Sequence, residues 1–169
     1  MEFELKPISR DAVPEALQKV ERYRLLNEPE QAESICHDVL AVAPDNQQAV
    51  AMLLLAITDQ FGSGGQGAHA ARAREVLKRF QGEYERAYYA GVIWERTARA
   101  QLRQGSPNAA FNAYDAFRKA MDCYEQAERI RPAGNDDALL RWNCCARTLM
   151  RNKNLRPRPE DTFEAVLGE

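Results

Sequence analysis

Apolar residues recur every three or four positions along most of this 169-residue chain. That spacing places them on one face of an α-helix, whereas the alternating apolar and polar runs typical of a half-buried strand are missing from the sequence. Prolines and glycines interrupt the helical pattern and divide it into segments. We therefore predict an all-α fold of seven helices joined by short breaks.

The breaks set the bounds of the predicted helices, because proline favours the first turn of a helix and glycine or proline ends one. The expected helices are Ala16–Leu26, Pro29 to just before Pro44, Asn46–Gln60, a segment through Ala73 and Phe80, Tyr84–Gln104, a long helix capped by Ser106 with Pro107 in its first turn and ending near Ile130, and a last one from Asn135 to Leu149. The length suits a single domain. We assign residues 1–11 to an N-terminal segment, 12–151 to the helical domain and 152–169 to a C-terminal tail.

Four glycines fall within the six residues Gly62–Gly67. Glycine is costly inside a helix, so this segment is expected to be a flexible loop between two helices. A phosphate-binding loop would need Lys followed by Ser or Thr after its last glycine, but Ala68 and His69 stand there. The loop therefore does not predict nucleotide binding.

Two parts of the chain repeat the same order of side chains at the same offsets. They are Ala32, Cys36, Val39 and Pro44 in the first part, and Ala120, Tyr124, Ala127 and Pro132 in the second. A small, a bulky and a small residue ahead of a proline resemble the second helix of a tetratricopeptide (TPR) repeat. Ala87, Ala90-Gly91 and Trp94 resemble its first helix. The resemblance implies antiparallel helix pairs stacked into a right-handed superhelix, with about three pairs and a terminal helix.

The resemblance also implies a binding site, because the first helix of each TPR pair lines a concave groove. The groove residues that it implies are Leu55, Asp59, Tyr88, Val92, Arg96, Arg99, Leu139, Asn143 and Arg147. An arginine side chain can bind a carboxylate through two parallel hydrogen bonds. An acidic peptide or partner protein is therefore the expected ligand.

Charge is unevenly distributed, although the net charge is only −2. Residues 1–60 carry 11 acidic and 5 basic side chains, residues 61–159 carry 18 basic and 10 acidic ones, and residues 160–169 carry 4 acidic and no basic ones. This asymmetry fits a partner with acidic segments or head-to-tail contacts between copies.

Catalytic and metal-binding chemistry has little support in the sequence. The four cysteines form no CxxC pair, and His37 and His69 are the two histidines, so neither a metal site nor a cofactor is expected. The acidic pair Asp136 and Asp137 stands at a predicted helix start, where the helix dipole favours negative charge. The sequence shows no secretory signal and no long apolar run, so we expect a cytoplasmic protein. Since the sequence offers no coherent catalytic set, we also expect that the protein is not an enzyme.

These observations favour a non-enzymatic protein–protein interaction module that binds a peptide or partner in a TPR-like groove, with self-association through its end faces as a further expectation. One alternative is a small TPR-type chaperone for a secreted or assembling client, since the predicted architecture resembles that of class II type III secretion chaperones. Another is an RNA-binding helical repeat, in which the aromatic residues between Tyr84 and Trp94 would stack on bases. The slightly acidic net charge disfavours nucleic acid as the partner.

Overall fold

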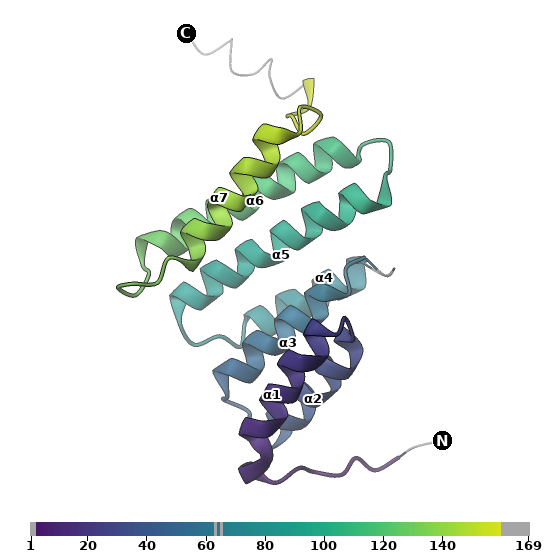
Figure 1. Ribbon diagram of the computed structural model, residues 1–169, viewed down its shortest axis with the longest axis vertical. Coiled ribbons are helices and arrows are strands. Elements are labelled where there is room, and N and C mark those ends of the chain that lie inside the picture. The colour runs from purple at the N-terminus through teal and green to yellow at the C-terminus, as the bar shows by residue number, and fades with distance from the viewer. Residues whose placement is uncertain (1–2, 63, 65, 160–169) are drawn as a thin grey trace. The chain divides into compact units, whose positions relative to one another are not determined.

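A computed structural model of the chain describes residues 3–62, 64 and 66–159, and the regular structure within them is helical (Figure 1). The elements in chain order are η1 (Arg10–Ala12), α1 (Val13–Leu25), α2 (Pro29–Val42), α3 (Gln47–Asp59), α4 (Gln66–Leu77), α5 (Glu83–Gln104), α6 (Ala109–Arg129) and α7 (Asp137–Arg151). The predicted all-α fold class is confirmed. None of the helices in the described part of the chain combines the length and apolarity that crossing a membrane requires.

Local sequence signals explain several of the helix boundaries. Pro14 and Pro29 lie in the first turns of α1 and α2. The side chain of Asn46 accepts a hydrogen bond from the backbone N–H of Ala49 at 2.9 Å and so caps α3. Gly105 ends α5 with φ 65°, a left-handed conformation that glycine adopts without steric cost.

Several boundaries differ from the prediction, among them the start of α1 at Val13 rather than Ala16 and the end of α4 at Leu77, before Phe80. The sixth helix begins at Ala109 rather than at Pro107, because residues 106–109 form a turn in which the Ala109 N–H bonds the Ser106 carbonyl. The helix α4 begins at Gln66, so Gly67 is helical and the predicted loop is shorter. Glycine costs about 1 kcal/mol relative to alanine in a helix interior because of its conformational freedom, and one glycine in the first turn does not prevent the helix from starting there. Residues 63 and 65 of that predicted loop lie outside the described residues.

The chain forms two compact units, one up to Gln81 and one from Gly82. In the first unit each helix packs on the next in sequence, and α1 also contacts α3. Its fully buried core includes Val20, Cys36, Val39, Val50, Leu53, Leu54, Ile57 and Phe61. A helix pair alone leaves an apolar face exposed, and the sequential packing of α1 to α4 covers these faces.

In the second unit, α5 and α6 form a long pair and α7 packs on α6. Phe117 and Tyr124 of α6 are fully buried. Tyr124 lies so close to Gly91 of α5 that a Cβ atom at Gly91 would be 2.5 Å from its ring. The absence of a side chain at this position is therefore what admits the tyrosine ring between the helices.

The segment after α7 returns to the second unit over residues 152–159. Leu155 is buried, and the guanidinium group of Arg158 donates a hydrogen bond to the side chain of Asn112 in the first turn of α6. This part of the predicted C-terminal tail is therefore packed against the helices. Residues 160–169 of the tail, and residues 1–2 of the predicted N-terminal segment, lie outside the described residues.

Candidate functional site

A buried carboxylate links the three helices of the second unit. Glu95 of α5 lies one turn after Gly91 and is only 3% exposed. Its Oε2 accepts hydrogen bonds from the Tyr124 hydroxyl of α6 at 2.8 Å and from Nη1 of Arg141 of α7 at 3.1 Å. Its Oε1 accepts from Nε and Nη2 of Arg99 at 3.1 and 3.0 Å. We call these four side chains the Glu95 cluster.

Opposing effects act on the charge of Glu95. Burial by itself raises the pKa of this carboxyl group, but Arg141, the Tyr124 hydroxyl and Arg99 all stabilise the ionised form and together lower the pKa below its ordinary value. Glu95 is therefore negatively charged at neutral pH. Since two arginines face this one carboxylate, the Glu95 cluster carries a net positive charge.

The two arginines of the cluster extend toward the protein surface. The side chains of Arg99 and Arg141 are 36% and 31% exposed. Nε of Arg141 donates to the Tyr88 hydroxyl at 3.3 Å, and Nη2 of Arg99 donates to Sγ of Cys144 at 3.5 Å. Cys144 is exposed on α7, so Arg99 connects the buried cluster with the outer face of that helix.

An open pocket of about 500 Å³ lies along the second half of α7. The residues that line it are Cys144, Arg147, Thr148, Arg151 and Asn152. We call it the arginine pocket, because Arg147 and Arg151 are exposed and one helical turn apart. Within residues 3–62, 64 and 66–159, no carboxylate lines this pocket or pairs with either of these arginines.

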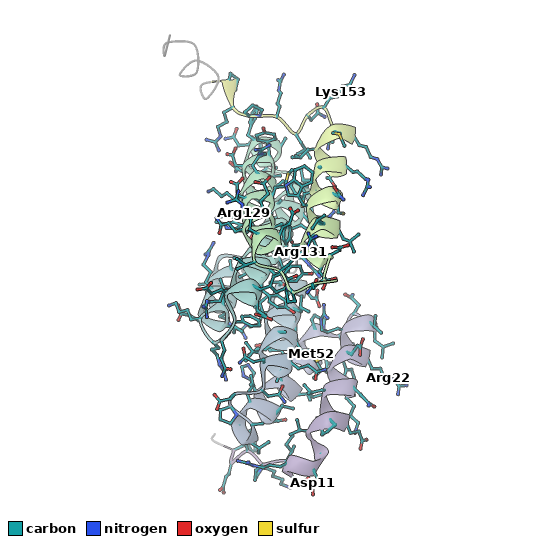
Figure 2. The ribbon with its side chains drawn as sticks, turned by 90° about the vertical axis from the view of Figure 1, so that its left-hand side faces the viewer. Asp11, Arg22, Met52, Arg129, Arg131 and Lys153 are labelled. Carbon is teal, nitrogen blue, oxygen red and sulfur yellow. The ribbon has the colours of Figure 1, made fainter. Side chains whose placement is uncertain are left out.

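A second open pocket, of about 640 Å³, lies between α6 and α7. Its lining consists of Glu125, Glu128, Arg129, Arg131, Leu139, Trp142 and Asn143, and Figure 2 labels Arg129 and Arg131. Two carboxylates balance two guanidinium groups there, and the Trp142 indole N–H donates to Glu125 at 3.0 Å. This pocket has no net charge, so the arginine pocket is the stronger candidate for an anionic ligand.

The structure places the predicted groove residues in different settings. Leu55 is half-buried in α3, and Asp59 of the same helix forms an ion pair with Arg24 at 2.7 Å. Val92 is fully buried, which corrects the prediction that it faces a ligand. Valine is among the residues most often buried, and this apolar position of α5 serves the core.

The remaining predicted residues belong to the second unit. Arg99 belongs to the Glu95 cluster, and the Tyr88 hydroxyl accepts a hydrogen bond from Arg141 of that cluster. Arg96 is half-buried on α5. Leu139 and Asn143 line the neutral pocket between α6 and α7. Of the predicted set, Arg147 is the residue that lines the arginine pocket.

Sequence reasoning missed Glu95 and Arg141, although part of the signal was present. Glu95 and Arg99 are four residues apart, a spacing that favours an ion pair on a helix. The contact from Arg141 joins residues 46 positions apart, and no local pattern indicates it. Among the described residues, no group of three or more His, Cys, Asp or Glu side chains is placed to hold a metal ion.

We expect Cys144 to react first when the folded protein meets Ellman's reagent. It is exposed, whereas Cys36 and Cys145 are buried and burial raises the pKa of each thiol to about 12. The pKa of the half-buried Cys123 is also raised, mainly by burial. The thiolate is the reacting form, so these three thiols should react slowly. Stopped-flow absorbance should show a fast phase that Cys144→Ser removes and Cys123→Ser retains; a fast phase in Cys144→Ser would contradict the assignment.

Comparisons with known proteins give no relative for this chain. No protein-family model, no curated protein and no solved structure matches it. The functional interpretation therefore depends on the chemistry of the two pockets and of the Glu95 cluster.

Proposed function

We propose that this chain is a non-enzymatic protein-interaction module of TPR-like helix pairs whose second unit binds an acidic segment of a partner protein. Within each unit the helices pack on their neighbours in sequence order, which supports the repeat interpretation. The observation that carries the binding proposal is the arginine pocket. Arg147 and Arg151 are exposed there, one turn apart, with no carboxylate from the described residues to neutralise them.

The chemistry of the pocket fits carboxylates. Each guanidinium group can donate two parallel hydrogen bonds to one carboxylate, and the two arginines would bind acidic side chains about 5–6 Å apart. Oδ1 of Asn152 accepts from the Asn154 N–H at 3.1 Å, which directs its amide NH2 group to other acceptors. The net positive charge of the Glu95 cluster, connected through Cys144, adds to the attraction.

The variant Arg147→Glu/Arg151→Glu should bind an acidic peptide at least about tenfold more weakly than the wild-type chain. Reversing both charges replaces attraction by repulsion at the pocket. The measurement is fluorescence anisotropy with labelled octaglutamate at low and at physiological salt, because screening weakens exposed ion pairs. The charge-matched control is Arg10→Glu/Arg22→Glu, which changes two exposed residues of the first unit (Figure 2 labels Arg22).

Equal loss of octaglutamate binding in both double variants would mean that net charge alone attracts the peptide, and this would overturn the assigned site. Absence of octaglutamate binding at low salt, both in the wild-type chain and in a chain whose four acidic residues of 160–169 are replaced by their amides, would overturn the proposed function. Tighter binding of single-stranded RNA than of octaglutamate, with a steep salt dependence, would instead favour a nucleic-acid-binding repeat.

A further inference from the structure

We infer that residues 160–169 of the same chain occupy the arginine pocket, so that an acidic partner must displace them. The inference rests on the proposed function, since both assign an acidic polypeptide segment to this pocket. It adds the identity of one such segment and a competition between that segment and the partner.

Charge complementarity is the first argument. Residues 138–159 contain six basic side chains and no acidic one, whereas residues 160–169 contain four acidic side chains and no basic one. The sign of the charge therefore reverses directly after Pro159. Phe163, Val166 and Leu167 add apolar side chains at helical spacing to the acidic segment. Cys144 and Thr148 offer them less polar surface beside the two arginines of the pocket.

The position of the last described residues is the second argument. The contacts of Leu155 and Arg158 hold residues 152–159 against the end of the second unit, where α6 begins and α7 ends (Figure 1). Lys153 lies at this end of α7 in Figure 2. Nε of Arg158 is buried and has no hydrogen-bond partner among the described residues. A buried donor of this kind favours an acceptor close by, and Glu160 and Asp161 follow within three positions.

The reach of the segment is sufficient. Ten residues extend over about 33 Å as an open chain and about 15 Å as a helix. The pocket runs from Cys144 to Asn152, which is about 12 Å along α7. A segment attached to its own site has an effective concentration in the millimolar range, so it occupies the site even where the free peptide would bind weakly.

A cysteine pair tests the occupancy directly in the full chain. In Val166→Cys, mild oxidation with diamide should join the introduced thiol to Cys144 within one chain, and peptide mass spectrometry identifies the product. Adding Arg147→Glu/Arg151→Glu should reduce its yield at least about fivefold, because the acidic segment is then repelled. The matched control carries Val166→Cys, Cys144→Ser and Arg118→Cys, which moves the partner thiol to an exposed position of α6.

Two outcomes of this experiment would overturn the inference. A disulfide that joins two chains would place the segment on a second copy instead of its own pocket. A yield no higher than that of the Arg118→Cys control would mean that the segment does not occupy the pocket.

Competition with octaglutamate separates this inference from the proposed function. Replacing the four acidic residues of 160–169 by their amides should strengthen octaglutamate binding at least about threefold. If the intrachain disulfide forms but neither chain binds octaglutamate, the proposed function fails and the intrachain contact stands. If both chains bind octaglutamate equally and the disulfide yield matches the control, the intrachain contact fails and the proposed function stands.

Discussion

Glu95→Gln is expected to lower the free energy of unfolding of the second unit by about 3–5 kcal/mol. The substitution keeps the size of the side chain but removes the negative charge that holds Arg99 and Arg141. Both guanidinium groups are about two thirds shielded from water, so they would face each other with no carboxylate between them. Removing one partner of a buried ion pair lowers the free energy of unfolding by more than the intact pair contributes, because the remaining charge stays desolvated.

Urea denaturation followed by tryptophan fluorescence measures this loss. Both tryptophans of the chain, Trp94 and Trp142, belong to the second unit, so their emission reports on the correct half of the chain. The control is Glu83→Gln in the first turn of the same helix, where the side chain is exposed and the cost should stay below about 1 kcal/mol. A cost of Glu95→Gln no greater than that of the control would show that water, not Glu95, stabilises the two arginines.

The pH dependence gives the same prediction an independent readout. The pKa of Glu95 is lower in the folded protein than in the unfolded chain, where an ordinary glutamate has a pKa of about 4.3. Its contribution is therefore complete above the unfolded pKa and is lost as the pH falls through the folded pKa. The difference in stability between the wild-type chain and Glu95→Gln should therefore shrink as the pH falls below the unfolded pKa of about 4.3. A difference that stays constant over this range would contradict the role assigned to the carboxylate.

The sequence predicts the helices well because each boundary depends on neighbours in the chain. Apolar spacing, Pro29 and Gly105 act within one or two turns, and the structure has the corresponding helices. The start of α6 was misplaced because Pro107 is also compatible with the turn before a helix. The boundary between Gln81 and Gly82 has no local signature, since apolar spacing indicates which face of a helix is buried but not which helix covers it.

The candidate site could be predicted only in part for the same reason. The sequence pattern assigned Arg147, which lines the arginine pocket, to the predicted groove, but not Arg151 one turn later on the same face of α7. It assigned Val92 to a ligand surface, although an apolar side chain on a long helix has a similar pattern in a core. It omitted Arg141, whose contact with Glu95 requires α5 and α7 to be brought together by α6.

Gly91→Ala should destabilise the second unit by about 1–3 kcal/mol. The new Cβ atom would lie 2.5 Å from Cε1 and 2.7 Å from Cδ1 of Tyr124, whose ring is fully buried and cannot move without disturbing its neighbours. The ring would have to shift, which would also weaken the 2.8 Å hydrogen bond from its hydroxyl to Glu95. The overlap must outweigh the gain of about 1 kcal/mol that alanine brings to a helix interior.

A double-mutant cycle attributes this cost to the tyrosine ring. In a Tyr124→Leu background the side chain is smaller, so adding Gly91→Ala should cost much less than it does in the wild-type chain. The matched control is Gly67→Ala in α4, where nothing lies within 4 Å of the new Cβ atom and stability should stay equal or rise by up to about 1 kcal/mol. Circular dichroism measures this control, because the first unit contains no tryptophan. An equal cost of Gly91→Ala in both backgrounds would show that the close approach of α5 and α6 does not depend on the fit between Gly91 and Tyr124.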